Sequence, residues 1–352
     1  MKIYNYKNNW QKLLTPEIVA MLTQIHEFKG KQNLFIESKA DVLTGLLDIA
    51  KIQSVESSNK IEGIYTSDDR IKKLALAKDN PKNRAEEEIA GYREVLKTIH
   101  ENHDNIVLKP NIILQLHRDL YKFNVSSKGG KYKIADNIIG ETLLDGTIRV
   151  RFQPLEAWAV PEAIESICAE YNEAIKDELI DPLLAILMFI LDFLCIHPFT
   201  DGNGRMSRLL TLLLLYRSEY IVGKYISIEK MIEETKDKYY EALQMSSIGW
   251  HNNENDYEPF VKYMLSVILE AYREFSSRVQ VLIESNLSKP ERIARIIEDK
   301  LGKITKQEIL QKCPDISETT VQRTLNELVK KNKIIKQSGG RYTSYIWNRE
   351  EE

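Results

Sequence analysis

The chain has 352 residues, 43% of them hydrophobic, which is enough for roughly two or three compact units with buried cores. Its formal net charge of -3 gives no overall bias toward nucleic acid or an anionic membrane. The three cysteines, Cys168, Cys195 and Cys313, form no CxxC pair and lie near no histidine cluster, which argues against a disulfide framework or a structural zinc site.

Most of the chain predicts α-helices, because apolar residues recur at spacings of three and four. The predicted helices span residues 16–28, 38–56, 84–101, 110–121, 161–174, 183–196, 204–218, 228–245 and 257–285. The amino terminus, MKIYNYKNNW, lacks the apolar run of a signal peptide. The most apolar segment, 183–196, is too short to span a bilayer and contains Asp192, which favours a buried core helix. We therefore expect a cytoplasmic protein without membrane contact.

The segment SNKIEG, residues 58–63, places Ser58 and Glu62 four residues apart, so a helix would carry both on one face. Gly63 would end that helix as its C′ residue. Glu62 would then lie in the last turn, where the helix dipole disfavours an anion by up to about 1 kcal/mol. A residue that breaks a local rule can indicate a function, although a surface helix that ends in Glu-Gly is the ordinary alternative.

Residues 129–154, GGKYKIADNIIGETLLDGTIRVRFQP, interrupt the helical pattern with glycines and β-branched residues. The pair Asp145-Gly146 stands between two short apolar runs, which is a hairpin signal. We predict a β-hairpin laid on a helical body. Taken alone, the segment favours an ordinary structural hairpin.

The segment HPFTDGNGRMSR, residues 197–208, connects two predicted helices. Pro198 disfavours α geometry for His197, so the first helix ends there. Gly202 and Gly204 allow a tight loop in which the backbone can approach a ligand closely. Backbone N–H groups at the start of the second helix form a natural seat for phosphate.

The side chains of this segment suit a nucleotide. Arg205 and Arg208 lie three residues apart on one helix face and match a polyphosphate better than a single phosphate. Asp201 offers one hard oxygen ligand, and Mg²⁺ takes one or two carboxylates plus substrate phosphates. His197 titrates near neutral pH and is the natural general base. A lone histidine or a lone GNG would more often be structural, whereas the combination predicts nucleotidyl or phosphoryl transfer.

HPFTDGNGRMSR resembles the Fic family pattern H-x-F-x-[D/E]-G-N-G-R-x-x-R at every position. The resemblance extends over roughly residues 109–265. It implies a mainly α fold, a Fic helical core with a β-hairpin flap. It also implies a protein adenylyltransferase, which moves AMP from ATP onto a Ser, Thr or Tyr hydroxyl of a target protein. The intact motif favours AMP over the UMP and phosphocholine that other members transfer.

The resemblance assigns a role to each position of the motif. It implies that His197 deprotonates the acceptor hydroxyl, that Asp201 holds Mg²⁺, and that Arg205 and Arg208 hold the β- and γ-phosphates. Phe199 would pack the loop onto the core. The residues that we expect to contact ATP are Glu62, Asn137, Ile138, Ile139, Gly140, Asp201, Gly202, Asn203, Gly204, Arg205, Met206, Ser207, Arg208, Tyr239 and Tyr240.

Two further segments resemble family features. KYKIADNIIG, residues 131–140, resembles the flap, on which a target segment docks by strand addition. Tyr239 and Tyr240 stand where relatives place a tyrosine pair beside the adenine or ribose. Adjacent helical residues point to different faces, so one tyrosine can be core and the other can line a pocket, and the bare sequence favours core packing.

SNKIEG resembles the Fic inhibitory motif [S/T]-x-x-x-E-[G/N], which relatives carry N-terminal to the core or on a separate partner. The resemblance implies that Glu62 pairs with Arg208 and thereby misaligns the α-phosphate of bound ATP. Ser58 would hydrogen-bond to Glu62 and steady it. The oligomeric state stays open, and a homodimer is one arrangement that could control this brake.

The last segment, residues 287–349, carries 14 Lys and Arg against 7 Asp and Glu, a local charge of +7. It predicts a winged helix-turn-helix domain with a recognition helix at 317–332, a stripe of Val321, Leu325, Leu328 and Val329, and a hairpin turn at Gly339-Gly340. The linker would be 285–290. We predict domains at 1–105, 106–285 and 286–352, with the inhibitory motif in the first.

Two alternatives to AMP transfer remain open at this point. The first is removal of AMP from a modified protein, with the inhibitory glutamate positioning a water. The second is a DNA-binding regulator in which the Fic site is secondary. Its candidate contacts are Thr319, Thr320, Gln322, Arg323 and Asn326, although winged helices also serve protein contacts. A gel shift whose retention is insensitive to salt would argue against contacts with DNA phosphates.

Overall fold

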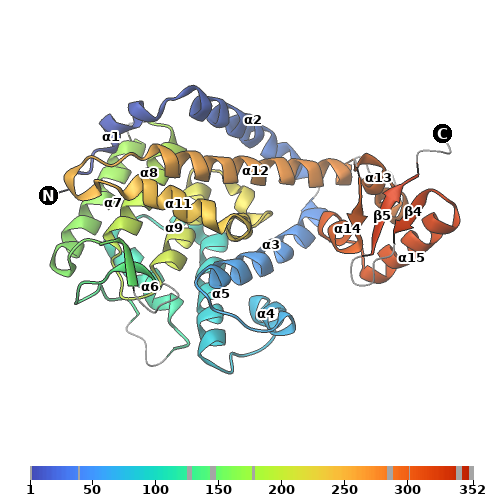
Figure 1. The fold of residues 1–352 in the computed structure, drawn as a ribbon, viewed down its shortest axis with the longest axis horizontal. Helices are drawn as coiled ribbons and strands as arrows, with labels where there is room; N and C mark the ends of the chain where they lie inside the picture. The colour runs from blue at the N-terminus through green and yellow to red at the C-terminus, as the bar shows by residue number, and fades with distance from the viewer. Residues whose placement is uncertain are drawn as a thin grey trace. The chain divides into compact units, whose positions relative to one another are not determined.

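The computed structural model describes residues 2–38, 40–124, 129–142, 148–176, 179–283, 288–300, 302–337 and 343–348 (Figure 1). The chain divides into two compact units. The larger unit comprises Met1–Gly30 and Ala50–Tyr272, and the smaller unit comprises Lys31–Ile49 and Arg273–Glu352. The finer boundaries predicted at 105/106 and 285/286 stay predictions.

The larger unit is built almost entirely of helices. The α-helices are α1 (Tyr6–Asn9), α2 (Pro16–Ser38), α3 (Ala40–Ile61), α4 (Asp68–Ala75), α5 (Arg84–Asn102), α6 (Pro110–Leu120), α7 (Val160–Lys176), α8 (Pro182–Ile196), α9 (Asn203–Arg217), α10 (Ile228–Glu234), α11 (Lys236–Ser247) and α12 (Glu258–Ile283). Short 3-10 turns are η1 (Trp10–Leu13), η2 (His103–Asn105), η3 (Ala157–Ala159), η4 (Ile221–Lys224) and η5 (Trp250–Asn252). Of the α-helices, α2, α3 and α12 continue into residues of the smaller unit.

The predicted helices are present, with several differences. Helix α2 runs to Ser38 instead of ending at residue 28, α3 spans Ala40–Ile61 instead of 38–56, and the short helix α1 was not predicted. The single helix predicted over 228–245 is wrong: α10 ends before Thr235 and α11 begins after it. The Thr235 hydroxyl donates 2.7 Å to the Met231 carbonyl, and this local bond competes with the helical ladder. The short helix α4 was not predicted. Its sequence has the features of a helix start, because Ser67 precedes the first turn and Asp68 and Asp69 lie within it.

Helix α8 forms the centre of the core and packs against α7 and α9 (Figure 1). It begins at Asp181, whose side chain accepts 2.9 Å from the Leu183 N–H. The helix is apolar on every face and buried along nearly its whole length, as its sequence predicts. Within the described ranges, each helix is either too short or too polar to cross a membrane.

Asp192 is the one acidic residue within α8 and has no exposed surface. Its carboxylate accepts 2.9 Å from the Tyr6 hydroxyl, 2.6 Å from the Trp250 indole N–H and 2.9 Å from the Tyr257 hydroxyl. A buried carboxylate is tolerated when donors satisfy its oxygens. This cluster therefore ties the first residues of the chain to the helix that leads into the candidate site.

The predicted hairpin is present as β1 (Ile139–Thr142) and β2 (Ile148–Phe152). The two strands pair antiparallel, with an irregularity between Ile139 and Gly140. The predicted turn at 145–146 lies outside the described residues. The strands begin later than the resemblance suggested, because residues 131–138 form a loop with bends at Ile134 and Ala135 rather than a strand.

The smaller unit contains α13 (Lys289–Asp299), β3 (Ile304–Thr305), α14 (Lys306–Lys312), α15 (Glu318–Lys330), β4 (Ile334–Gln337) and β5 (Ser344–Trp347). Its antiparallel sheet has the order β3-β5-β4. The predicted stripe on α15 is buried or packs against this core. Helices followed by a hairpin are the order expected of a winged helix-turn-helix; the predicted turn at 339–340 lies outside the described residues.

The predicted linker over 285–290 needs one correction. Lys289 and Pro290 form the first turn of α13, which begins with a capping box between Ser288 and Glu291. Proline suits a first turn because its missing N–H would have no helical partner there. Residues 285–287 lie outside the described part of the chain.

Candidate active site

His197 ends helix α8 in a left-handed conformation, with φ 52° and ψ 62°. Its backbone N–H donates 3.0 Å to the Phe193 carbonyl, so the helical ladder stops at this residue. Its ring Nδ1 lies 3.4 Å from the Leu194 carbonyl, which can only accept a hydrogen bond. The proton of the neutral ring therefore sits on Nδ1, and Nε2 keeps the lone pair that a general base requires.

The pKa of His197 is lowered to about 4, chiefly by burial and to a smaller extent by the nearby Lys133 ammonium. The hydrogen bond to Leu194 and the carboxylates of Glu62 and Asp201 act in the opposite direction. The imidazole is therefore neutral at physiological pH. Burial also lowers the pKa of Lys133 to about 8.

The loop after His197 is closed by Asn203. The Asn203 side chain donates 2.7 Å to the Phe199 carbonyl and accepts 2.9 Å from the Phe199 N–H. Gly202 follows with φ 82°, and a side chain there would also meet the Tyr121 hydroxyl at 2.9 Å. Helix α9 begins directly after this turn, so its first N–H groups face the loop. The side chain of Asn203 thus shapes the loop rather than reaching outward.

Asp201 presents its carboxylate to solvent, with 61% of the side chain exposed. Its Oδ1 accepts 2.7 Å from the Gly202 N–H, and its Oδ2 lies 3.9 Å from Arg205 Nη2. Among the described residues, no three His, Cys, Asp or Glu side chains are grouped to hold a metal. One exposed carboxylate beside a phosphate seat fits Mg²⁺, which binds through few protein ligands plus substrate phosphates.

Helix α3 brings Ser58 and Glu62 to the start of α9. The Gly63 N–H donates 3.0 Å to the Lys60 carbonyl and the Ile64 N–H donates 3.0 Å to the Asn59 carbonyl. With Gly63 at φ 77°, these bonds form a Schellman motif that ends the helix, as the sequence predicts. Glu62 is the C-cap residue, at the negative end of the helix dipole.

The side chain of Arg208 is bound by residues at this end of α3. Its Nη2 donates 2.7 Å to Glu62 Oε1 and 2.8 Å to the Ser58 carbonyl, and its Nε donates 2.8 Å to Ser58 Oγ. Only 4% of Arg208 is exposed. Burial is the largest effect and opposes the charge of the guanidinium, but Glu62, Tyr239 and Tyr92 together outweigh it and hold the Arg208 pKa above its usual value. The expected bond from Ser58 to Glu62 is wrong in detail, because Ser58 contacts the guanidinium that lies between them.

The Glu62 carboxylate also covers the first turn of α9. A methyl group added at Gly204 would collide with Glu62 Oε1 and lie 3.3 Å from Arg208 Nη1. The carboxylate therefore occupies the place where an anion would meet the start of the helix.

Arg205 points to the other side of α9. Its Nη2 lies 2.9 Å from Glu88 Oε2 and donates 2.9 Å to the Tyr121 hydroxyl. The residue is 1% exposed, yet its Nε and Nη1 have no hydrogen-bond partner. Buried guanidinium nitrogens are rarely left unsatisfied, so the residue fits a site that an anionic group completes.

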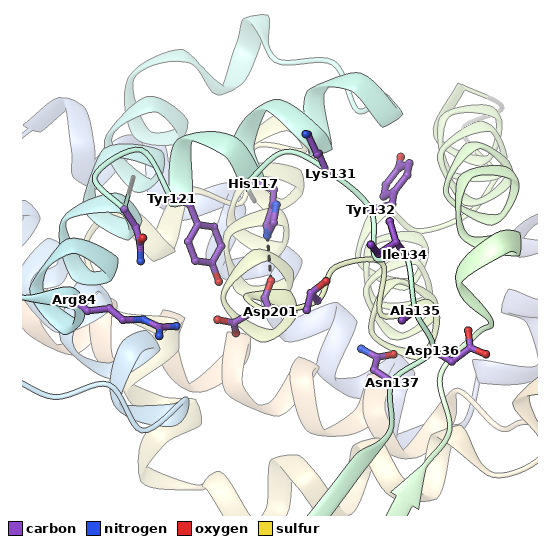
Figure 2. A pocket seen from close by; sticks show the side chains of 12 residues that line it. Arg84, His117, Tyr121, Lys131, Tyr132, Ile134, Ala135, Asp136, Asn137 and Asp201 are labelled. Carbon is purple, nitrogen blue, oxygen red and sulfur yellow. Dashed lines mark hydrogen bonds between the residues drawn. The ribbon is translucent and has the colours of Figure 1, made fainter. Parts of the chain in front are cut away.

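Two cavities border the loop 197–204. The larger, about 710 Å³, is lined by Asp201 and Asn137 of the predicted residues, by His117 of α6 and by Tyr121, which directly follows that helix (Figure 2). The smaller is about 200 Å³ and includes these predicted residues: Glu62, Ile139, His197, Gly204, Arg208, Tyr239 and Tyr240. Its other walls are Arg151, Phe152, Leu191, Leu194, Cys195, Leu243, Gln244 and Ser247.

The tyrosine pair does not divide between core and pocket. Tyr239 and Tyr240 both line the smaller cavity, with ring centroids 5.4 Å apart. Tyr239 is 3% exposed and also packs against Phe260 and Tyr263. It therefore belongs to the core and to the cavity wall at once.

Several predicted ATP contacts do not line either cavity. Met206 has no exposed surface, and the Ser207 hydroxyl donates 2.8 Å to the Gly204 carbonyl within α9. Ile138 is 52% exposed, and Gly140 lies in β1. Asn137 does line the larger cavity, and its Oδ1 accepts 2.8 Å from the Lys133 ammonium.

Three residues at the loop were not predicted: Glu88, His117 and Lys133. The Lys133 N–H donates 2.9 Å to the Pro198 carbonyl, and its ammonium lies 3.3 Å from the Ile196 carbonyl at the end of α8. Each of the three contacts at least one residue distant in sequence, Arg205 for Glu88, Asp201 for His117 and Pro198 for Lys133, and local pattern does not reveal these contacts. One feature of the sequence could have indicated Lys133 as a site residue, because it lies inside the flap segment KYKIADNIIG.

The chain is similar to adenylyltransferases in its sequence. Residues 107–215 match the Fic/DOC family. "Protein adenylyltransferase Fic" of Culex quinquefasciatus is 27% identical over 68% of this chain and 45% of its own length. The protein of that name from Aedes aegypti is 26% identical over 72% of this chain and 50% of its own length. The chain thus spans about half the length of these curated relatives.

Solved structures show the same fold. A Fic family protein from Desulfovibrio desulfuricans G20 has a TM-score of 0.61 and 19% identity, over 96% of this chain and 97% of that one. A Fic domain containing signaling protein from Bacteroides thetaiotaomicron VPI-5482 has a TM-score of 0.61 and 21% identity, over 73% and 98%. The fold of this chain is thus the one found in these Fic proteins, and its residues 107–215 match the Fic/DOC family.

Proposed function

We propose that this protein transfers AMP from ATP to a hydroxyl group of a target protein, and that Glu62 restrains the reaction. One observation carries the proposal: His197, Gly204 and Arg208 line one cavity, and Glu62 fills its phosphate end. The relatives named protein adenylyltransferase support the same chemistry. Three buried free cysteines suit a reducing compartment, and we propose the cytoplasm.

In the proposed reaction, Nε2 of His197 takes the proton of the acceptor hydroxyl. The hydroxyl oxygen bonds to the α-phosphorus while the bond from that phosphorus to the bridging oxygen breaks. AMP stays on the target, pyrophosphate leaves, and the proton remains on the imidazole. The first N–H groups of α9 and the guanidinium of Arg208 would hold the phosphates. A magnesium ion on Asp201 would supply positive charge against the phosphates when it is bound.

Glu62 is proposed to act by position and charge. Its carboxylate takes one donor of Arg208 and lies against Gly204, where it repels the γ-phosphate and shifts ATP along the cavity. A shift near 1 Å can reduce a rate by on the order of a hundredfold, because attack requires alignment with the leaving group. ATP would therefore bind in an unproductive position.

The target segment is proposed to dock along the β1–β2 hairpin. In the described part of the chain, these strands pair with each other and form a sheet of two. Outer backbone groups of such a hairpin can accept a further strand with little sequence preference.

The test is an intact-mass measurement after incubation with ATP and Mg²⁺, using wild type, Glu62→Gly and Glu62→Gly with His197→Ala. We expect little self-modification of wild type and addition of AMP to Glu62→Gly, at a rate roughly ten- to a hundredfold higher. The double variant should gain no mass.

The double variant also controls for damage to the nucleotide site, since it should still bind ATP. Because self-modification needs an accessible hydroxyl, labelling of added lysate with ATP radioactive at the α-phosphate gives a second readout. Equal labelling by wild type and Glu62→Gly in both assays would disprove the brake. An absence of AMP transfer from every variant that binds ATP would reject the enzyme.

Removal of AMP is a second candidate. The Glu62 side chain is 32% exposed and shares the cavity with His197, so it could hold a water beside the phosphorus of an AMP-modified residue. Water would then replace the target hydroxyl and release AMP. Incubation of wild type with an AMP-modified protein tests this: release of free AMP that is lost in Glu62→Gly favours removal.

A further inference from the structure

His117, on helix α6, contacts three separate parts of the site (Figure 2). Its Nε2 lies 3.1 Å from the Asp201 carbonyl, and its Nδ1 accepts 3.0 Å from the Gly130 N–H. Its ring stacks on Phe199, with centroids 3.6 Å apart and planes within 3°. The residue is 4% exposed, so these contacts are shielded from water.

The two bonds select a single form of the ring. A carbonyl only accepts and an amide N–H only donates, so the ring must be neutral with its proton on Nε2. It then joins the turn before the hairpin to the tip of the catalytic loop. A flat ring with a donor on one edge and an acceptor on another meets both demands while stacking on Phe199. Both ring nitrogens of His117 thus have hydrogen-bond partners within the protein.

These contacts of His117 restrain Asp201, the residue with the exposed carboxylate. His117 fixes the Asp201 backbone, and the Gly202 N–H fixes Oδ1 at 2.7 Å. The other oxygen, Oδ2, lies 3.9 Å from Arg205 Nη2, and the side chain as a whole is largely exposed. The direction of that oxygen therefore depends on where His117 holds the loop.

We propose that His117 is a positioning residue that sets the Asp201 carboxylate for a divalent cation bound with ATP. The inference rests on the proposed function, because it needs Asp201 to meet the metal of Mg·ATP. Outer partners of metal ligands typically change metal affinity by about 10- to 100-fold. His117 acts on the backbone of Asp201 rather than on its carboxylate, so we expect an effect near the lower end, about tenfold.

The experiment measures binding rather than turnover. In the Glu62→Gly background, the dissociation constant of a ribose-labelled fluorescent ATP analogue is measured once with Mg²⁺ and once with EDTA. The ratio of the two constants reports how much the cation contributes to binding. Asp201→Ala gives the ratio expected when the carboxylate is absent. His117→Phe keeps the ring stacked on Phe199 but removes both hydrogen bonds.

His117→Phe should lower the ratio of the dissociation constant in EDTA to that in Mg²⁺ about tenfold, toward the value of Asp201→Ala. The dissociation constant measured in EDTA should change little. His117→Gln, which can still donate to the Asp201 carbonyl, should restore most of the ratio. His103→Phe is the matched control, since His103 is also buried and lies against Tyr216. It should leave the ratio unchanged even where it lowers stability.

The outcomes separate the two proposals. If the Glu62→Gly parent binds the analogue with a strong Mg²⁺ effect and His117→Phe keeps that ratio, the positioning role is wrong and the enzyme proposal stands. If His117→Gln and His117→Phe lose the ratio equally while melting at the same temperature, the donated bond is not what matters and the inference fails. If the parent does not bind the analogue at all, the proposed function itself fails.

Discussion

At the scale of single residues, the contacts of Arg208 indicate how the proposed inhibition by Glu62 could be removed without loss of the site. A buried charge that loses its partner usually destabilises a protein by several kcal/mol. Arg208 has three acceptors, however, and two of them belong to Ser58. Removal of Glu62 would leave both Ser58 bonds in place. The guanidinium would then stay oriented toward the cavity and could meet a phosphate.

The pKa of His197 predicts the acid limit of AMP transfer. Since the base must be neutral and its pKa is lowered to about 4, transfer by Glu62→Gly should be retained as pH falls from about 7 to about 5. It should be lost only as the pH passes through the lowered pKa. The profile of kcat/KM against pH checks this, with folding monitored at each pH. An acid limb near the ordinary value of 6.5 would contradict it.

Lys133 offers an internal control for that profile. Its ammonium lowers the pKa of His197, so Lys133→Met should move the acid limb of the profile to higher pH. A profile unchanged in Lys133→Met would show that the Lys133 ammonium does not contribute to the lowered pKa of His197.

At the scale of elements, the end of α3 decides where the Glu62 carboxylate lies. The Schellman motif at Gly63 fixes the last turn of the helix, and Glu62 extends from it toward Arg208. An anion at a helix C-terminus is disfavoured by the dipole, so the contact with Arg208 must outweigh that cost. The unfavourable position is consistent with a residue kept for its effect on the site rather than for stability.

Gly63→Ala tests this cap. Gly63 has φ 77° with open space around it, so a methyl group would strain the backbone without a clash. We expect the free energy of unfolding in urea to fall by about 1 kcal/mol. Transfer activity should rise, since a distorted last turn displaces Glu62.

Gly45→Ala is the matched control for this substitution. Gly45 lies in the same helix, also in open space, but without positive φ. Alanine there should stabilise the protein by about 0.5–1 kcal/mol and leave transfer unchanged. If Gly63→Ala behaved like Gly45→Ala, the cap would not position the brake.

The outer face of α15 does not favour DNA over protein as a partner. Thr319, Arg323 and Asn326 are exposed there, as the sequence predicts. Glu318 and Glu327 are also exposed, and Glu327 lies 4.0 Å from Arg323. The local charge of +7 is therefore not concentrated on the helix that would enter a groove. DNA binding stays a prediction.

At the scale of the whole molecule, buried neutral histidines predict sensitivity to acid. Burial lowers the pKa of His100 to about 3 and the pKa of both His117 and His197 to about 4, from 6.5. The unfolded chain therefore binds more protons than the folded one below 6.5. Stability is present above that pH and is lost as the pH falls toward 4, by at most about 1.4 kcal/mol per pH unit for each group.

Urea unfolding at about pH 7 and about pH 5 checks this prediction. The unfolding free energy should be lower at the acidic pH, and His100→Phe should show a smaller difference than wild type. A stability that rises between those pH values as the solution becomes more acidic would contradict the assignment.

The helices, the hairpin and the chemical motif could be read from the sequence because each has a local signal. The motif 197–208 combines a helix stop, two glycines and a helix start within twelve residues, and SNKIEG ends in its own cap. The pairing of Glu62 with Arg208, 146 residues apart, came from family resemblance and not from pattern. Glu88, His117 and Lys133 escaped prediction because their contacts with Arg205, Asp201 and Pro198 are made only when the chain folds.

The pairing of Glu62 with Arg208 within one chain has a consequence for dosage. A tethered group acts at an effective concentration that does not depend on how much protein is present. Under the proposed function, diluting the protein would not release Glu62 from Arg208. Overproducing the protein would not leave copies without an inhibitor, as it could if the inhibitor were a separate chain. Each new copy would be synthesised already restrained. The amount of AMP transferred in a cell would then depend on changes in the conformation of the end of α3, and not on the abundance of the protein.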